Sequence, residues 1–343
     1  MGKRLVNNRY ALAGLAGLLL AAAFLLFGAM TPKPAEAVRP AWVTATTRPM
    51  RAALADEPQQ PGGERRRGMY TLLLAGQDNG NGNTDTLMLM RLDTTTHSID
   101  VVSIPRDTMI NTAWQIHKIN AAYSMGVYEG GSGPEALCRY AAGLTGFEVD
   151  GYAIVSLNAF VRAVDAMGGV YFDVPFNMDY EDPSQNLSIH LQKGYQLLNG
   201  TQAMQLCRYR SGYASADLGR IDMQQRFLKA CAAQFIDRGS IPNAVRVVEI
   251  LASELETDMS ATRIAWLLAQ VLACKSENIR FSVAPSLADT VGGYSYTILQ
   301  LDPWLELLNR CLNPGTRPIT AEELDVVYAQ DGEIRCTAAA KFR

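Results

Sequence analysis

The sequence predicts an α/β protein: a three-layer α/β/α sandwich with a central mixed, largely antiparallel sheet, after an N-terminal transmembrane helix. Residues 70–75, 86–92 and 99–104 each have the length of a strand and are bounded by turn residues. The second of these segments is apolar at successive positions, as in strands that are buried on both faces. Helices must therefore cover both sides of the sheet, which gives three layers.

The N-terminal part of the chain predicts a membrane anchor. Residues 10–30 carry no charge across 21 positions, and as a helix they would extend about 32 Å, enough to cross a bilayer core. Lys3, Arg4 and Arg9 precede them, so the positive-inside tendency places residues 1–9 in the cytoplasm and the rest of the chain outside. Residues 35–37 resemble a signal-peptidase site, which makes cleavage the alternative to a retained single-pass anchor.

The segment after the anchor reads as a linker. Residues 31–67 contain six prolines and end in a basic run, a composition poor in core-forming side chains. Residues 68–343 then form one folded domain with its C-terminal extension, because no repeat or further apolar span interrupts them.

Helical and strand patterns alternate through the rest of this domain. Helices are predicted at residues 133–144, 157–167, 200–206, 219–236, 242–254 and 261–274, and strands at residues 152–155, 170–174 and 279–284. Residues 294–299, 303–312 and 325–329 have strand or helix character without a chemical motif, so we keep them in the same domain.

Charge and cysteine usage exclude several classes of function. A formal net charge of -3 argues against nucleic acid as a partner. The six cysteines are widely spread without a C-x-x-C pair or a nearby histidine, which argues against zinc. Outside the membrane they are free to form disulfides, but buried thiols are an equal alternative. The chain has no Walker A string, no G-x-S-x-G elbow and no dinucleotide fingerprint.

Acidic and basic residues flank the first three predicted strands. If these strands form consecutive antiparallel hairpins, then Asp78, Asp85, Arg106 and Asp107 meet at one edge of the sheet. Asp78 and Asp85 supply the hard oxygen ligands that Mg²⁺ takes from proteins, together with water and phosphate oxygens. The alternative is that both acids serve the Asn/Gly turn between the strands.

A second group of cations lies far along the chain. Arg208 and Arg210 would leave one face of an extended segment, with Tyr209 on the other. Guanidinium forks match phosphate oxygens, so several of them converging on one place favour a pyrophosphate ligand. Lys118 is a further phosphate contact of lower rank. For any one of these residues, an ordinary surface ion pair is the alternative.

The segment after Arg210 predicts a helix with an anion-binding start. Asp217 can cap a helix that begins near Gly219, which would put Arg220 in the first turn, where unpaired backbone N–H groups also favour an anion. Gln224, one turn further on, would project from the same side.

The order of these motifs resembles the LytR-CpsA-Psr family of bacterial cell-envelope proteins across residues 70–235. The resemblance rests on residues 73–78 with 84–86, 103–108, 118–123, 164–170, 198–200 and 208–225. It implies an anchored α/β/α domain that binds a polyprenyl-pyrophosphate-linked glycopolymer and transfers it, as a phosphodiester, to a peptidoglycan sugar hydroxyl. Mg²⁺ is the metal of the family.

By motif position the resemblance also implies residue roles. Asp78 and Asp85 look like the metal-associated acids, and Arg106 with Asp107 like the active-site pair. The pyrophosphate-binding set corresponds to Arg208, Arg210, Arg220 and Gln224. Two positions depart from the family pattern, because Asn79 and Met223 stand where basic residues are common.

An apolar groove between sheet and helix is expected to hold the prenyl chain. Phe160, Val161 and Val164 are lining residues for this groove, with core packing as their alternative role. Two other functions use the same site. One is hydrolysis of the lipid pyrophosphate, and the other is a membrane-tethered module that binds or regulates without turnover.

Overall fold

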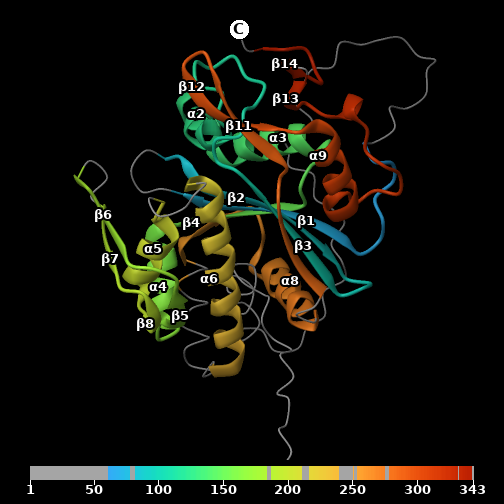
Figure 1. Cartoon of the computed structure of the whole chain (residues 1–343). Helices are drawn as coiled ribbons and strands as arrows, with labels where there is room; N and C mark the ends of the chain where they lie inside the picture. Colours follow the sequence, from blue (N-terminus) through green and yellow to red (C-terminus); the bar gives the residue numbers. More distant parts are fainter. Residues whose placement is uncertain are drawn as a thin grey trace, which may run out of the picture.

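Two antiparallel hairpins lie at the centre of the molecule in the computed structural model, which describes residues 61–77, 82–183, 187–210, 216–238, 250, 253–274, 278–330 and 332–341. They consist of β1 (Met69–Gln77), β2 (Thr84–Asp93) and β3 (Ser98–Ile104). Three later strands complete a six-stranded sheet, namely β4 (Gly151–Ser156), β9 (Leu255–Thr257) and β10 (Ile279–Val283). Within the described part of the chain, the order is β10-β3-β2-β1-β4-β9 (Figure 1).

The sheet is mixed, as predicted. β1 pairs with β2, β2 with β3 and β4 with β9 in antiparallel fashion, whereas β1–β4 and β3–β10 are parallel. The end of β1 therefore lies beside the start of β2 and the end of β3, with Gly76 opposite Thr86 and Leu87 opposite Ile104. This edge carries the predicted site.

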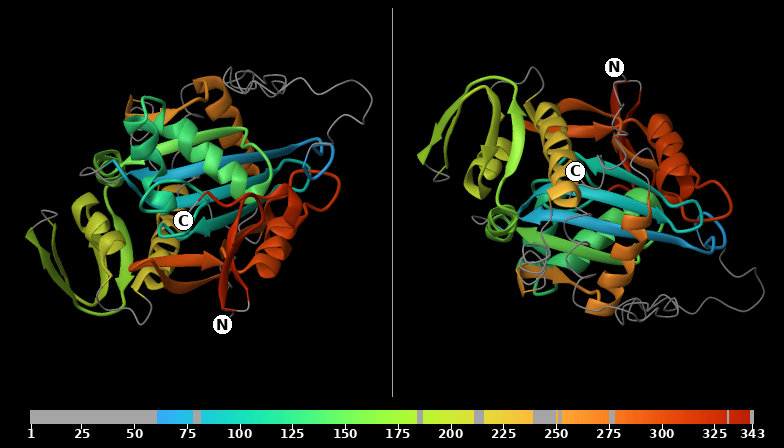
Figure 2. Two further views of the ribbon diagram at one scale, coloured as in Figure 1. Left: turned by 90° about the horizontal axis from the view of Figure 1, so that it is seen from above. Right: turned by 90° about the horizontal axis from the view of Figure 1, so that it is seen from below.

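Alternate side chains of the strands enter two separate cores. Leu72 and Leu74 belong to one buried cluster, while Leu73 and Ala75 belong to the other, because successive strand side chains point to opposite faces. The first cluster packs against α4 (Leu157–Ala166), α5 (Gly200–Arg208), α6 (Ala216–Arg238) and α8 (Ala261–Ala273). The second packs against α3 (Gly133–Thr145) and α9 (Leu301–Leu307). Helices thus lie on both sides of the strands, which gives the three layers (Figure 2).

Capping residues define where the helices near the site begin. The side chain of Ser156 accepts a hydrogen bond from the backbone of Ala159 at the start of α4. Asn199 and Gln202 form a reciprocal capping box at the start of α5. On the other side of the sheet, helix α2 (Ala122–Tyr128) follows the short 3-10 turn Ile119–Ala121 and precedes α3.

The C-terminal part of the chain adds a second sheet. It contains β11 (Ser286–Val291), β12 (Tyr294–Leu299), β13 (Val327–Gln330) and β14 (Glu333–Cys336), in that order. Between β12 and β13, α9 continues into a π-helical turn at Leu308–Leu312, which is followed by a 3-10 turn at Ala321–Glu323. Trp304 is fully buried, and its indole N–H donates to the carbonyl of Leu144 at 2.8 Å. These elements agree with the strand and helix character read from the sequence.

Three short strands of two further antiparallel pairs were not predicted, namely β6 (Met178–Asp182), β7 (Leu187–Leu191) and β8 (Gly194–Leu198). β6 pairs with β7, and β8 pairs with the predicted strand β5 (Val170–Val174). The alternation of buried Leu187, Ile189 and Leu191 with exposed residues is the signal that indicates β7. Most of the predicted helix at residues 242–254 lies outside the described residues.

The predicted anchor, residues 10–30, also lies outside the described residues. None of the helices that the structure describes combines the length and apolar character that a membrane span requires. Residues 61–67, the end of the predicted linker, lie against the domain. Arg65 forms an ion pair with Asp150, and Arg66 donates to the carbonyl of Asn313 at 2.6 Å. All six cysteines are free thiols.

Candidate active site

The ends of the first three strands bring acidic and basic side chains together. Asp85 is the second residue of β2, and Arg106 and Asp107 follow the last residue of β3. The antiparallel pairing places these positions at one edge of the sheet, where Arg106 and Asp85 form an ion pair at 2.5 Å. Asp78, the other predicted metal ligand, lies outside the described residues.

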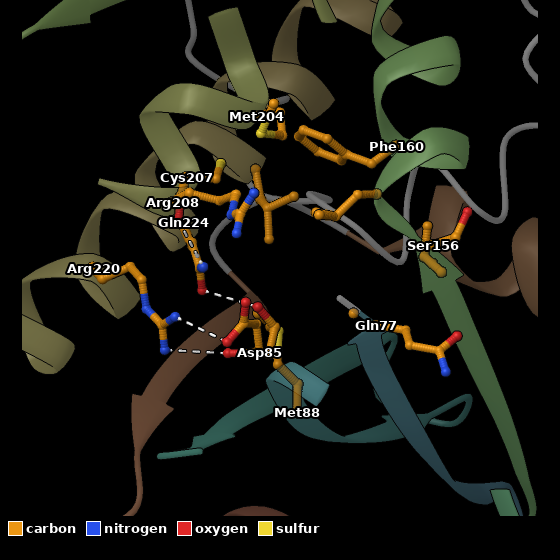
Figure 3. Close-up of a pocket in the computed structure, with 15 residues that line it drawn as sticks. Gln77, Asp85, Met88, Ser156, Phe160, Met204, Cys207, Arg208, Arg220 and Gln224 are labelled. Carbon is orange, nitrogen blue, oxygen red and sulfur yellow. Dashed lines mark hydrogen bonds and ion pairs between the residues drawn. The ribbon is translucent and has the colours of Figure 1, made fainter. Parts of the chain in front are cut away.

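Three arginines surround Asp85. Its Oδ1 atom lies 2.5 Å from Arg106 Nη1, 3.3 Å from Arg210 Nη2 and 3.6 Å from Arg220 Nη1. Arg220 also donates from Nη2 to the backbone carbonyl of Asp85 at 3.2 Å. Figure 3 shows Arg220 reaching from α6 to both oxygens. Residues more than a hundred positions apart thus meet at one carboxylate.

The arginines control the ionisation of Asp85. Burial raises the pKa of this carboxyl group, but the positive charges of Arg220, Arg106 and Arg210, with the hydrogen bond from Arg106, outweigh that effect and lower the pKa below its usual value. The carboxylate is therefore ionised at neutral pH and holds the guanidinium groups close to one another.

Asp107 and Lys118 extend the cluster on its other side. Lys118 Nζ lies 3.2 Å from Asp107 Oδ1, and Arg106 Nε lies 3.8 Å from the same oxygen. Arg106, Lys118, Arg210 and Arg220 thus surround two carboxylates, so four positive charges exceed two negative ones. The surplus suits an anionic ligand that carries more than one charge.

Helix α6 differs from the prediction at its start. It begins at Ala216, so Arg220 lies in the second turn and not beside the unpaired N–H groups of the first. The predicted helix-end contribution at Arg220 is therefore wrong. The Arg220 side chain is only 2% exposed and acts through its guanidinium group, while the Asp217 side chain lies outside the described part of the structure.

Gln224 bridges protein groups. The hydroxyl of Thr86 donates to Gln224 Oε1 at 3.3 Å, and Gln224 Nε2 donates to the carbonyl of Cys207 at 3.0 Å. These contacts join β2 to the end of α5 through α6. The neighbouring Gln225 donates to the Ser103 hydroxyl at 2.9 Å and so joins α6 to β3.

Arg208 and Arg210 both lie at the site, but they do not share one face of an extended segment, as their spacing had predicted. Arg208 is the last residue of α5, and Tyr209 has an extended backbone just after the helix. Tyr209 packs into the core, 5.9 Å from the ring of Phe176. Arg208 lines a pocket (Figure 3). Arg210 Nη2 lies 3.3 Å from Asp85 Oδ1.

A mainly apolar pocket opens beside the charged cluster, between the strand ends and α4, α5 and α6 (Figure 3). Phe160, Met204, Met88 and Leu228 line its apolar part. Its polar part contains Asp85, Arg208, Arg220 and Gln224. An apolar recess next to a cationic group is the shape expected for a ligand with a hydrocarbon chain and an anionic head.

Of the three residues expected to line a groove, only Phe160 lies in this pocket. Val164 is fully buried in the core, and Val161 lines a separate surface pocket with Arg162 and Glu254. Met223, the second departure from the family pattern, is also a core residue at 1% exposure.

The predicted magnesium site depends on the oxygen donors at the strand ends. Within the described residues, no group of three or more histidine, cysteine, aspartate or glutamate side chains is arranged to hold a metal ion. Asp85 supplies one hard carboxylate, next to the cations that would bind phosphate. Mg²⁺ commonly takes one or two carboxylates and completes its shell with water and phosphate oxygens. The residues therefore fit a magnesium ion that is bound jointly with a phosphate ligand.

Sequence reasoning missed two features of the site. Gln77, Ser156 and Cys207 line the pocket but carry no motif that marks them. The ring centroid of Tyr296, on β12, lies 5.7 Å from Lys118 Nζ. The sequence showed no chemical motif in this C-terminal stretch. Only the alternation of residues 294–299 indicated a strand there, and alternation does not reveal its distant neighbour.

Acid should weaken the contribution of Asp85 to stability. Because its folded-state pKa is lowered, the charged form stabilises the fold above the ordinary value of 3.8, and this contribution is lost as pH falls through the folded-state pKa. We expect Asp85→Asn to lower the free energy of unfolding at pH 7. The difference from wild type should shrink below pH 3.8, as measured by urea unfolding. A difference that stays constant with pH would contradict the assignment.

The fold and the site define a class of protein: a mixed α/β domain with a cationic cluster at a sheet edge and an apolar pocket beside it. The LytR_cpsA_psr family model matches residues 43–310, so the chain belongs to this family. The family resemblance read from the motifs is thereby confirmed.

Individual relatives agree with this assignment. TagU of Oceanobacillus iheyensis, named a polyisoprenyl-teichoic acid–peptidoglycan teichoic acid transferase, is 27% identical over 66% of this chain and 70% of its own length. TagV of Bacillus subtilis, with the same enzyme name, is 29% identical over 53% of this chain and 46% of its own length. The matched region thus spans about half of TagV. The crystal structure of gbs0355 from Streptococcus agalactiae shares the fold, with a TM-score of 0.62 and 24% identity over 73% of this chain and 89% of that one.

Proposed function

We propose that this protein is a membrane-anchored phosphotransferase that moves a glycopolymer from a polyprenyl-pyrophosphate carrier to a sugar hydroxyl of peptidoglycan. The product is a phosphodiester. Residues 10–30 would anchor the chain, with the folded domain outside the cell. The observation that carries the proposal is the convergence of Arg106, Arg210 and Arg220 on Asp85 at the polar end of an apolar pocket.

The charge of the cluster supports a pyrophosphate ligand. Arginine forks bind phosphate oxygens in pairs, and the buried position of Arg220 strengthens each contact relative to water. The pocket beside the cluster supports a lipid carrier, because Phe160, Met204 and Leu228 offer an apolar surface to a hydrocarbon chain. The transferase names of the relatives agree with this substrate class.

We propose a transfer step that uses these residues. The acceptor hydroxyl oxygen forms a bond to the phosphorus that carries the glycopolymer, and the bond from that phosphorus to the bridging oxygen of the pyrophosphate breaks. Polyprenyl phosphate leaves with the bridging oxygen and the electron pair. Asp107 accepts the hydroxyl proton, while Arg106, Arg210 and Arg220 stabilise the charge that grows on the leaving phosphate.

Asp85 would hold Mg²⁺ together with the phosphate oxygens and with Asp78. The ion would supply positive charge that neutralises the pyrophosphate and its leaving group. Arg208 would contact the ligand from the pocket wall, and Lys118 from the side of Asp107. Gln224 would act by joining β2 to α5, because its amide contacts Thr86 and Cys207.

The test uses the purified full chain with a polyprenyl-pyrophosphate-linked glycopolymer and peptidoglycan fragments. We expect polymer joined to peptidoglycan through a phosphodiester, with equimolar release of polyprenyl phosphate. Chelation of Mg²⁺ should lower the rate at least about tenfold, because a bound metal is worth several kcal/mol of charge stabilisation. Mass spectrometry of the products measures both outcomes.

The same assay distinguishes the two alternatives. Polymer phosphate released into water, with no attachment to peptidoglycan, would identify a hydrolase and contradict the transfer. Retention of the carrier with neither product would identify a binding module. Equal turnover in wild type and Arg106→Ala would contradict the site itself.

A further inference from the structure

The loop that follows β3 is held in place by the C-terminal sheet. This loop, residues 105–119, carries Arg106, Asp107 and Lys118. The backbone N–H of Thr297 on β12 donates to the carbonyl of Asp107 at 2.9 Å, and the N–H of Met109 donates to the carbonyl of Thr297 at 2.9 Å. The backbone of Asp107 is therefore fixed by a strand almost two hundred residues away.

The two ends of the loop also pair with each other. Met109 and Lys118 form an isolated antiparallel bridge, and the N–H of Ile119 donates to the carbonyl of Thr108 at 3.0 Å. The N–H of Asn120 donates to the carbonyl of Arg106 at 3.1 Å. Lys118 thus returns to the site beside the segment that carries Arg106 and Asp107.

Asn111, between the paired ends of the loop, binds the C-terminal part of the chain. Its Nδ2 donates to Asp325 Oδ1 at 2.7 Å and to the carbonyl of Ala339 at 3.0 Å. Its Oδ1 accepts from the N–H of Lys341 at 2.7 Å. The loop is therefore bound to the C-terminal part of the chain at both β12 and the tail.

Tyr296, next to Thr297, contacts the loop with its side chain. It is 2% exposed and packs with Met109 in a small cluster that also contains Ile298. The ring centroid lies 5.7 Å from Lys118 Nζ, within the range of a cation–π contact. The phenol oxygen accepts a hydrogen bond from the backbone N–H of His117 at 3.3 Å.

These contacts confine a side chain that is otherwise flexible. Lysine has four rotatable side-chain bonds and loses substantial rotamer entropy when its ammonium group is fixed. Here the Tyr296 ring lies on one side of the Lys118 ammonium group and Asp107 Oδ1 lies 3.2 Å away. The ring reduces the number of rotamers before a ligand arrives, which lowers the entropic cost of binding.

We propose that Tyr296 is a positioning residue, which holds the ammonium group of Lys118 beside Asp107 in the orientation that receives a pyrophosphate. The proposal rests on the proposed function, because it assigns Lys118 to the same ligand. It also gives the C-terminal sheet a role in the site that the motifs between residues 70 and 235 do not contain.

The experiment measures the affinity of the full chain for inorganic pyrophosphate with Mg²⁺ by calorimetry, without requiring turnover. Tyr296→Leu removes the ring but keeps an apolar side chain, and should weaken binding about three- to tenfold. Lys118→Met should weaken binding at least as much. The double variant should bind no more weakly than Lys118→Met alone, because the ring acts through the lysine. Tyr296→Phe keeps the ring and should bind within about twofold of wild type.

Ile298→Val provides the matched control. Ile298 is buried in the same cluster as Tyr296, so this change should lower the unfolding temperature without altering pyrophosphate affinity. Wild-type affinity in Tyr296→Leu, additive losses in the double variant, or a Tyr296→Phe chain as weak as Tyr296→Leu would overturn the proposal. A wild-type chain without measurable affinity for pyrophosphate would contradict the proposed function itself and remove the basis of the inference.

Discussion

Arg220→Met should lower the turnover number for glycopolymer transfer by about 10²–10³-fold, the loss typical of removing one preorganised charge-stabilising donor. Arg220 is almost completely buried and contacts both the carboxylate and the backbone carbonyl of Asp85. It is also the strongest of the positive charges that lower the pKa of Asp85, so its removal should raise that pKa. Steady-state rates of polyprenyl phosphate release measure the effect.

Two further variants separate the chemistry from stability. Arg220→Lys keeps the charge but loses the planar fork, and should recover only part of the lost rate. Arg226→Met removes an exposed arginine of the same helix, and should leave the rate within about twofold of wild type. If Arg220→Met and Arg226→Met were equally active while both remained folded, the pyrophosphate assignment of Arg220 would be wrong.

Asp100→Asn should cause a large loss of stability, about 3–5 kcal/mol, because it leaves a buried guanidinium group without its counter-charge. Asp100 lies directly opposite Arg91 on β2 and beside Arg280 on β10. It accepts from Arg91 Nη2 at 2.6 Å, and from Arg280 Nε and Nη2 at 2.7 and 3.0 Å. The side chains of Arg91 and Asp100 are 8% and 2% exposed. Urea unfolding of the full chain measures the loss.

An exposed ion pair gives the control for this prediction. Glu333 and Arg335 lie 3.3 Å apart with largely exposed side chains, so Glu333→Gln should change stability by less than about 1 kcal/mol. Replacing both buried partners, as Arg91→Met with Asp100→Leu, should restore most of the stability lost in Asp100→Asn. Equal effects of Asp100→Asn and Glu333→Gln would show that the buried network is not a major contributor.

Local sequence signals were sufficient for much of the fold. The apolar runs of β1 to β3, separated by turn residues, predicted two hairpins, and the pairing of Gly76 with Thr86 and Leu87 with Ile104 agrees with them. Helices α3, α4 and α5 were predicted close to their observed bounds from helical patterning, and the structure shows that the capping side chains of Ser132, Ser156 and Asn199 fix their starts. Short strands such as β6 and β9 were missed, since a few residues carry too little periodicity.

The candidate site was predictable only in part. Hairpin geometry alone places Asp85 beside Arg106, because the strands that carry them are neighbours in sequence and in space. The sequence nominated Arg210 and Arg220 as phosphate ligands through their residue type, but it did not assign either of them to Asp85. It also placed Arg220 in the wrong turn of α6.

The sequence by itself determined the first three strands, several later ones, most helices and the set of charged residues, because hydrophobic period and turn residues act over a few neighbouring positions. Tertiary structure alone decided that Arg220 of α6 contacts Asp85 and that Tyr296 of β12 lies against Lys118. Such contacts depend on how helices and a second sheet pack against the central strands. Packing of this kind is set by the shape of the whole core, and no local pattern in the chain encodes it.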